Sequence, residues 1–286
     1  AKPSKAKQSQ AKPSKAKKTK ENQKKKKKKN NPKPKTIHYS QLAPNKLPKK
    51  TMSKKTIQTN ESMEVLDGLK ALDTPTVCNA LENVDRNRRA RGFNVRPFVC
   101  AHPELPSVVG YVRTARIRAT HRPTAPSDSD GYYSYIAEGG PVPSVVVIQD
   151  LDEIPGYGAQ WGEVNTNVHY GLGCLAVVTN GSIRDIPDSA PNFQMLAGMI
   201  NPYHACVKVV DWGMSVNVHG MDADDGDLIH CDMHGAVIIP TEAAAGVIEE
   251  AAKIAARENV LISAAQQPGF NMARMREAWK GMAEIH

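Results

Sequence analysis

Two short segments of the sequence carry side chains that suit chemistry on a small anion. One contains Gly162 and Glu163, at the expected start of a helix; the other, residues 180–185, reads Asn-Gly-Ser-Ile-Arg-Asp and ends in Arg184 and Asp185. Mg²⁺ in proteins usually takes one or two carboxylates and completes its shell with water and substrate oxygens. Arginine presents a forked pair of donors to a carboxylate or a developing enolate. Together these residue types could hold an anionic substrate beside a hard cation.

Two buried-type strands are expected to position these segments. Residues 144–148 (SVVVI) and 175–179 (LAVVT) are short β-branched runs, typical of strands covered on both faces. Residues 162–170 between them have a helical pattern, so a parallel strand-helix-strand unit is predicted. Ligands of such sheets bind beyond the carboxyl ends of the strands. We therefore expect the glutamate and the arginine-aspartate pair to meet at one edge of the sheet.

Hydrophobic spacing predicts the other elements of an α/β domain whose second half is rich in strands. The expected helices are 63–69, 75–83, 130–138, 188–199, 241–258 and 272–282, and the expected strands are 108–119, 205–210, 216–219, 227–230 and 236–239. Residues 61–286 are predicted to form one domain.

The positive charge of the chain is concentrated at its N-terminus. The whole chain carries a net charge of +9, and residues 1–60 contain 21 lysines but a single acidic residue, Glu21. Such a composition cannot bury enough apolar surface to fold, so a disordered tail is predicted. A flexible polycation binds phosphates without reading sequence, which would allow non-specific contact with nucleic acid. A merely solubilising extension is the interpretation we favour.

Several protein classes are disfavoured by the sequence. There is no run of about 18 apolar residues, as a membrane-spanning helix requires, and no apolar segment of a secretory signal follows the basic N-terminus. The five cysteines are widely spaced and form no Cys-x-x-Cys pair. We expect a cytoplasmic protein with reduced thiols and no membrane contact.

The motifs also resemble those of a known family. Glu163, twenty further residues and then Arg184-Asp185 resemble the acid-x20-Arg-Asp signature of the proteins named after regulator of ribonuclease activity A. That family includes the metal-dependent 4-hydroxy-4-methyl-2-oxoglutarate aldolases. Segments 161–163 (WGE), 171–173 (GLG), 225–230 (DGDLIH) and 234–240 (HGAVIIP) agree with it, and the resemblance runs from about residue 63 to 257.

This resemblance implies a fold and a set of roles. The fold would be the swivelling β/β/α domain of that family, assembled as a homotrimer or hexamer with sites at subunit boundaries. Asp185 would bind a divalent cation, Mg²⁺ or Mn²⁺, and Arg184 would hold the substrate and stabilise its enolate. Glu163 would orient water beside the metal, and the backbone amides around Gly162 and Val164 would receive a carboxylate.

The activity implied is that of a carbon–carbon lyase. A 2-oxo dicarboxylic acid such as 4-hydroxy-4-methyl-2-oxoglutarate or oxaloacetate would undergo retro-aldol cleavage or decarboxylation to give pyruvate, with the cation as Lewis acid. An acid from a neighbouring subunit would complete the site, and the sequence leaves Glu242, Glu249, Glu250 and Glu258 open. The alternative function is a non-catalytic regulator that binds a ribonuclease or RNA.

Two further clusters have both a functional and a structural interpretation. His230, Asp232 and His234 could share one face of a strand as metal ligands, but we favour a strand and turn held by polar contacts. Four arginines within residues 86–91 could bind phosphate, but we favour a solvated turn.

Overall fold

The computed structural model describes residues 61–121 and 126–285. All the described residues belong to one compact unit. The predicted disordered tail, residues 1–60, lies outside the described residues.

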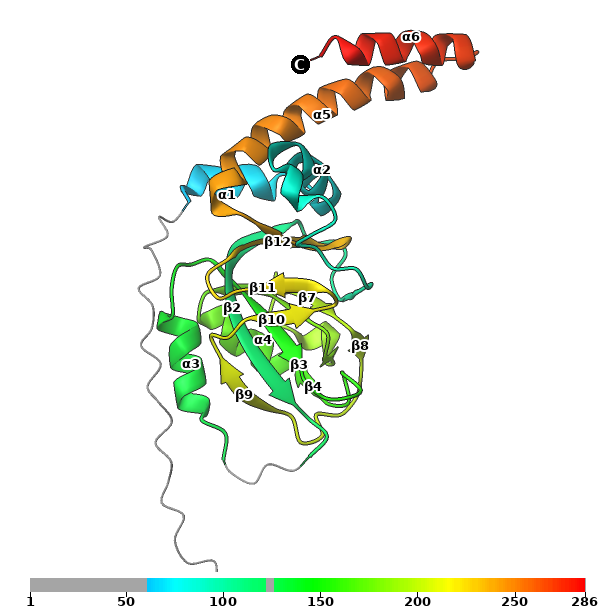
Figure 1. Cartoon of the computed structure of the whole chain (residues 1–286). Helices are drawn as coiled ribbons and strands as arrows, with labels where there is room; N and C mark the ends of the chain where they lie inside the picture. The colour runs from blue at the N-terminus through cyan, green and yellow to red at the C-terminus, as the bar shows by residue number, and fades with distance from the viewer. Residues whose placement is uncertain (1–60, 122–125, 286) are drawn as a thin grey trace, which may run out of the picture. The chain divides into compact units, whose positions relative to one another are not determined.

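A curled sheet forms the centre of this unit (Figure 1). Its strands run in the order β1 (Val99–Cys100), β7 (Gln194–Ala197), β5 (Cys174–Thr179), β3 (Ser144–Asp150), β2 (Val108–Arg118), β12 (Leu228–Asp232) and β13 (Gly235–Ile239), with β9 (Lys208–Trp212) also paired to β2. The pairs β2–β3, β3–β5 and β5–β7 are parallel, and the sequence predicted the β3–β5 pair. Strand β2 is long enough to pair with β12 along its first half and with β9 along its second.

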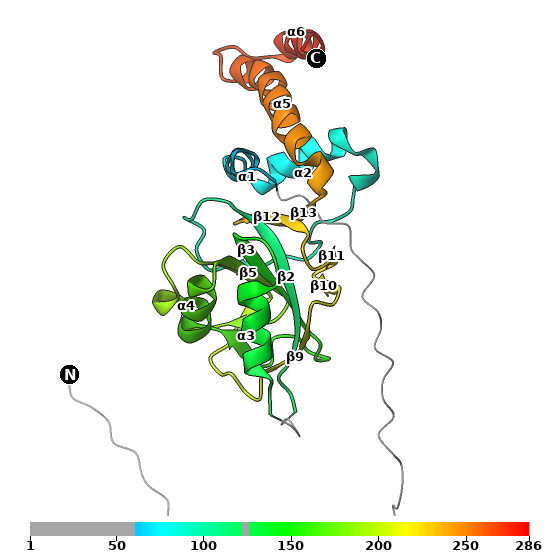
Figure 2. The ribbon, with the colours of Figure 1, turned by 90° about the vertical axis from the view of Figure 1, so that its left-hand side faces the viewer.

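The two faces of the sheet have different cover. On one face, Val112, Val147 and Val178 pack in a cluster with the hairpin of β10 (Val216–Val218) and β11 (Met221–Ala223). On the other, strand residues of β2, β3 and β5 pack with α3 (Ser129–Glu138) and with Leu172, which follows α4 (Glu163–Gly171), and Figure 2 shows both helices on this face. Burial on both faces explains why these strands lack apolar-polar alternation.

Three helices cover the β12–β13 end of the sheet. These are α1 (Met63–Lys70), α2 (Thr74–Val84) and α5 (Ala244–Ala265), whose apolar residues form one cluster with those of β12 and β13. Helix α6 (Met272–Ala283) folds back along the second half of α5 (Figure 1). No helix in residues 61–121 or 126–285 has both the length and the hydropathy that crossing a bilayer demands.

A second, smaller sheet lies beside the first. It consists of three parallel strands, β4 (Ala159–Trp161), β6 (Ser182–Ile183) and β8 (Met199–Ile200). Trp161 is fully buried, and its ring packs 5.9 Å from that of Phe193 and 4.5 Å from that of His169. These contacts fix the position at which β4 ends and α4 (Glu163–Gly171) begins.

One sequence-based prediction about this region is wrong, whereas the next strand is found. The helix expected at 188–199 is a 3₁₀ turn, Ile186–Asp188, followed by β7 and β8. Pro191 would interrupt a helix there, and residues 194–197 instead pair in parallel with β5. The strand expected at 205–210 is β9, which runs antiparallel to β2. Sequence reasoning also missed the short strands β1, β4, β6 and β8.

Candidate functional site

The carboxylate of Asp185 lies over the N-terminus of α4. Gly162 caps this helix in an extended conformation, with φ −172° and no side-chain cap, whereas Asp185 is left-handed, with φ 48° and ψ 39°. A Cβ on Gly162 would lie 2.7 Å from Asp185 Oδ2 and 3.1 Å from Arg184 Cγ. Glycine therefore leaves the space that the aspartate and arginine occupy, next to unpaired N–H groups that favour negative charge.

Arg184 is held through its backbone, and its side chain is partly exposed beside Asp185. Its N–H donates to the carbonyl of Trp161 at 2.9 Å, which ties the loop after β6 to the end of β4. Its Nε is 3.5 Å from Asp185 Oδ2, and the two side chains are 37% and 39% exposed. One guanidinium and one carboxylate are thus held together where solvent and a small ligand can reach them.

The small sheet is what brings these loops together. Trp161 is the register partner of Ile183 in the parallel pair β4–β6, so Gly162 and Arg184 each follow the last residue of adjacent strands. The sequence argument placed the loops at the ends of β3 and β5. Both segments do follow those strands along the chain, and the short strands β4 and β6, which were not predicted, end directly before Gly162 and Arg184.

Thr166 fastens the first turn of α4 to the segment that follows Asp185. Its buried hydroxyl donates to the carbonyl of Gly162, 2.9 Å away, and lies 3.0 Å from that of Glu163. The same oxygen accepts the N–H of Ala190 at 2.9 Å. This hydroxyl was not identified from the sequence, where a single threonine in a helix carries no signal.

Glu163 and Val164 are the first two residues of α4, and both are exposed. Within the part of the chain that the structure describes, no contact joins the Glu163 carboxylate to Arg184 or Asp185. The structure therefore brings Gly162, Arg184 and Asp185 together and leaves Glu163 beside them on the same turn.

The donor set at this site suits only some metals. Among residues 61–121 and 126–285, no group of three His, Cys, Asp or Glu side chains could enclose an ion. That composition does not match zinc or other metals held by several protein ligands. A single exposed carboxylate does match Mg²⁺ or Mn²⁺, which retain most of their oxygen ligands from water or substrate.

Exposed apolar side chains surround the same edge of the small sheet. The large ones are Ile154, Tyr157, Val164, Met199, Ile200 and Tyr203. Asn201 donates to the carbonyls of Gly156 and Tyr157, at 2.9 and 3.2 Å, and so joins the loop after β3 to the end of β8. Apolar patches of this kind, rimmed by polar groups, commonly mark binding surfaces.

A cavity of about 690 Å³ lies elsewhere, between the β10–β11 hairpin and the start of α5. Its lining includes Gln149, Asp222, Asp224 and Glu242, and none of the three clustered site residues. Glu249, Glu250 and Glu258 are all in α5, and Glu250 accepts a hydrogen bond from Asn83 at 3.0 Å. Which of the four glutamates serves a neighbouring subunit stays a prediction.

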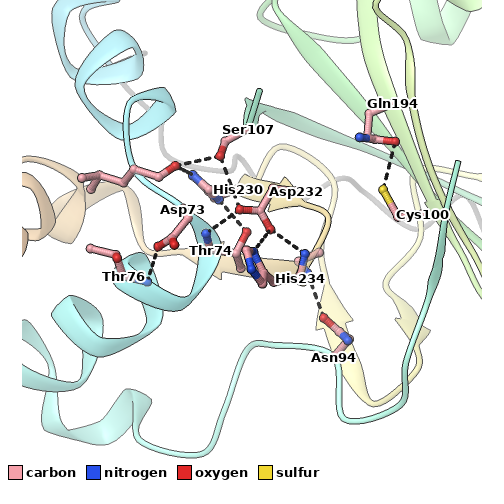
Figure 3. A network of polar contacts seen from close by, with 12 residues as sticks. Asp73, Thr74, Thr76, Asn94, Cys100, Ser107, Gln194, His230, Asp232 and His234 are labelled. Carbon is pink, nitrogen blue, oxygen red and sulfur yellow. Dashed lines mark hydrogen bonds and ion pairs between the residues drawn. The ribbon is translucent and has the colours of Figure 1, made fainter. Parts of the chain in front are cut away.

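His230, Asp232 and His234 belong to a network of polar contacts (Figure 3). His230 is fully buried, with Nδ1 3.0 Å from the Thr74 hydroxyl and Nε2 3.2 Å from the carbonyls of Leu69 and Leu72. Burial lowers the pKa of His230, which keeps it neutral. The structural interpretation of this cluster is confirmed.

Asp232 completes the same network (Figure 3). Its carboxylate accepts the N–H of Thr74 and of His234, both at 2.8 Å. Burial would raise the pKa of Asp232, but these hydrogen bonds outweigh it and hold the pKa below its usual value. The negatively charged carboxylate therefore links the start of α2 to the β12–β13 turn.

Comparison with protein families matches residues 74–238, more than half of the chain, to the family described as RraA-like: Aldolase/RraA. The chain belongs to this family. The match spans β4, α4 and β6 and so contains Gly162, Arg184 and Asp185. A comparison with curated proteins found no match.

Several solved structures have a fold similar to that of this RraA-like chain. An uncharacterized protein from Pseudomonas syringae pv. tomato is 22% identical with a TM-score of 0.60, covering 81% of this chain and all of its own. A protein titled as a novel cellulase from gut-associated microbes is 19% identical (TM-score 0.59; 72% and 90% covered). A Streptomyces coelicolor protein, described as an unusual member of the RNase ES inhibitor RraA family, is 18% identical (TM-score 0.56; 70% and 96% covered). The expected α/β fold class, the swivelling β/β/α domain, is confirmed.

Proposed function

We propose that this RraA-like protein is a divalent-metal-dependent lyase that releases pyruvate from a 2-oxo dicarboxylic acid. The substrates we propose are 4-hydroxy-4-methyl-2-oxoglutarate, by retro-aldol cleavage, and oxaloacetate, by decarboxylation. The observation that carries this proposal is the position of Asp185 and Arg184 over the uncapped N-terminus of α4, at the ends of adjacent parallel strands.

Each clustered residue has a role that its geometry supports. The Arg184 guanidinium, 37% exposed and anchored through its backbone, would bind the substrate carboxylate and stabilise the enolate that develops when the C–C bond breaks. The backbone N–H groups around Gly162 and Val164 would receive the second carboxylate of the substrate, since a helix N-terminus binds anions.

Asp185 would hold Mg²⁺ or Mn²⁺, and Glu163 would orient water next to it. When bound, such a cation supplies Lewis-acid stabilisation of the negative charge that forms on the substrate. The left-handed backbone of Asp185 directs its carboxylate toward α4, and Gly162 leaves room for it.

We propose further that the protein acts as a homotrimer or hexamer in the cytoplasm. The exposed apolar side chains of β8 and the loop before β4 lie beside the site, where another copy could cover them. An acid from that copy, Glu242, Glu249, Glu250 or Glu258, would complete the site. Mass measurement in solution, together with alanine variants of each glutamate, tests this arrangement.

The test of the activity is a pyruvate-release assay with oxaloacetate and 4-hydroxy-4-methyl-2-oxoglutarate, run with Mg²⁺, with Mn²⁺ and with EDTA. We expect turnover that EDTA abolishes, and a loss of about 100-fold or more in Asp185→Asn. Asparagine tolerates the left-handed backbone, so this variant removes charge with little strain. Asp188→Asn, an exposed acid in the same turn, is the matched control and should keep full activity.

The alternative function, a regulator that binds a ribonuclease or RNA, is favoured by the 21 lysines of residues 1–60. It predicts no turnover of either substrate, and salt-sensitive RNA binding. Retention of that binding after deletion of residues 1–60 would assign it to the RraA-like domain, and its loss would assign it to the lysines.

A further inference from the structure

The arginine-rich segment after α2 is a turn with mostly exposed arginines, as expected, and it also borders a pocket. A 3₁₀ turn, Arg86–Arg88, follows α2, and the chain then reverses through Ala90 (φ 62°) and Gly92 (φ 78°). The N–H of Arg91 donates to the carbonyl of Arg88 at 3.0 Å. Phe93 then forms a bridge with Val237 of β13. This path leaves a cavity of about 320 Å³, within the range of small-molecule sites.

The pocket has a surplus of positive charge. Arg88, Arg89 and Arg91 line it, and Glu82 is its single acidic lining residue. Glu82 Oε1 is 2.9 Å from Arg89 Nε. Among the described residues, Arg89 is the one of the three arginines in an ion pair with a carboxylate. Arg88 and Arg91 make no ion pair within the described residues, although Arg88 also borders a cavity lined by Asp222, Asp224 and Glu242.

Arg88 is held in place before any ligand arrives. Its Nη2 donates to the carbonyl of Ile238 at 2.6 Å, and its buried Nε has no hydrogen-bond partner within the described residues. Gly92 lies against the guanidinium, because a Cβ there would be 3.1 Å from Nη2. A fixed, planar donor group of this kind binds an anion at a lower cost in side-chain entropy.

The charges of the lining residues favour an anion in the arginine pocket over an anion in the neighbouring cavity. Arg88 also lines the cavity of about 690 Å³, but Asp222, Asp224 and Glu242 there would repel negative charge. In the arginine pocket, Cys78 carries no charge, because burial, with Asp232 and Asp73, raises its pKa to about 11.

We propose that this pocket binds the phosphate group of a small phosphorylated molecule. Arginine forks match the geometry of phosphate oxygens, and the pocket volume suits a phosphate or pyrophosphate moiety with a small attached group. The site is separate from Gly162, Arg184 and Asp185, and it does not depend on the proposed lyase activity.

The experiment is calorimetric titration of the full chain with inorganic phosphate and with pyrophosphate at fixed ionic strength. The test variant is Arg89→Ala with Arg91→Ala, which leaves Arg88 and its bond to Ile238 intact. Because the variant removes two charged hydrogen-bond donors, we expect pyrophosphate affinity to fall by about tenfold or more. Pyruvate release, measured in parallel, should not change.

The matched control is Arg86→Ala with Arg276→Ala. Both arginines are exposed and lie outside the pocket lining. Their substitution removes the same net charge as the test variant does. Unchanged affinity in this control supports the pocket. Equal weakening in both double variants would overturn it, because binding would then follow overall charge or the lysines of residues 1–60. Absence of binding by the unmodified chain at about 1 mM pyrophosphate would also overturn it.

RNA is the competing ligand, and it gives a different result. Binding of a single-stranded oligonucleotide that falls steeply with salt and is equal in both double variants, without any pyrophosphate binding, would place phosphate recognition outside the pocket.

Discussion

Asp185 Oδ2 lies so close to Gly162 that a methyl group on the glycine would come within 2.7 Å of it. The φ of Gly162 is −172°, an extended value that any residue can adopt, so alanine would not strain the backbone. Gly162→Ala should instead displace the carboxylate of Asp185 and the side chain of Arg184. We expect pyruvate release to fall by about tenfold or more, because a shift of about 1 Å in a positioned group is costly.

Gly171→Ala is the control for this change. It lies at the other end of α4, and a Cβ there would meet no atom within 4 Å. This variant should keep its activity and its melting temperature. If Gly162→Ala were equally active, the close approach of Asp185 to α4 would have no catalytic meaning.

Thr166→Val should uncouple α4 from the segment after Asp185. The change keeps the volume of the side chain but leaves the buried N–H of Ala190 without its acceptor. An unsatisfied buried donor costs about 1–3 kcal/mol of unfolding free energy. We expect kcat to fall more than the affinity for substrate, since the arginine and aspartate would lose their fixed position.

Thr166→Ser is the control, because it keeps the hydroxyl group that Thr166→Val removes. Serine keeps the hydroxyl that contacts Gly162, Glu163 and Ala190, so activity and stability should return to near those of the unmodified protein. Chemical denaturation and steady-state kinetics measure the two effects. Loss of activity in both variants alike would point to packing, and not to the hydrogen bonds.

His169 should make the folded state sensitive to acid. It is fully buried, its Nδ1 lies 2.7 Å from the carbonyl of Asn165, and its Nε2 lies 2.9 Å from the Tyr132 hydroxyl. Burial lowers the pKa of His169 to about 4 from its usual 6.5. The unfolded chain therefore binds a proton first as the pH falls.

The stability due to neutral His169 is full above pH 6.5 and is lost as the pH falls from 6.5 toward 4, a change of about 3 kcal/mol. Urea unfolding across this range measures it. In His169→Gln the dependence should be weaker by about that amount, since the amide does not titrate. An identical pH profile in the variant would contradict the assignment.

Asp232→Ala should destabilise the protein by about 2–4 kcal/mol, because two buried backbone N–H groups, of Thr74 and His234, lose their acceptor. Asp67→Ala, on the exposed side of α1, should change the unfolding free energy by less than about 0.5 kcal/mol. Chelators should leave the melting temperature of both unchanged. If a metal raised the melting temperature of the unmodified protein but not that of Asp232→Ala, the cluster would be a metal site.

The long elements of this protein could be predicted from the sequence. The runs SVVVI and LAVVT have the continuous apolar character of strands covered on both faces, and their parallel pairing in β3 and β5 is confirmed. The helix after Gly162 could also be predicted, because local spacing and glycines define it. The structural role of His230 and Asp232 was the favoured interpretation, but their partners in α1 and α2 were not predicted.

Shorter features required the tertiary structure. Strands β4, β6 and β8 have two or three residues each, too few to show any period, and they exist only because their neighbours pair with them. For the same reason, sequence reasoning did not find the short strands that end at the site, and took residues 188–199 for a helix.

The sequence alone determined which residues are available for chemistry: the glutamate, the arginine and the aspartate at their spacing, and the arginines that follow α2. Only the tertiary structure decided what lies beside what. Asp185 meets Gly162 because β4 and β6 end side by side, and Arg88 faces a pocket because β13 lies beneath its turn. Contacts between residues far apart in the chain depend on the packing of the whole domain, and local sequence patterns do not contain that information.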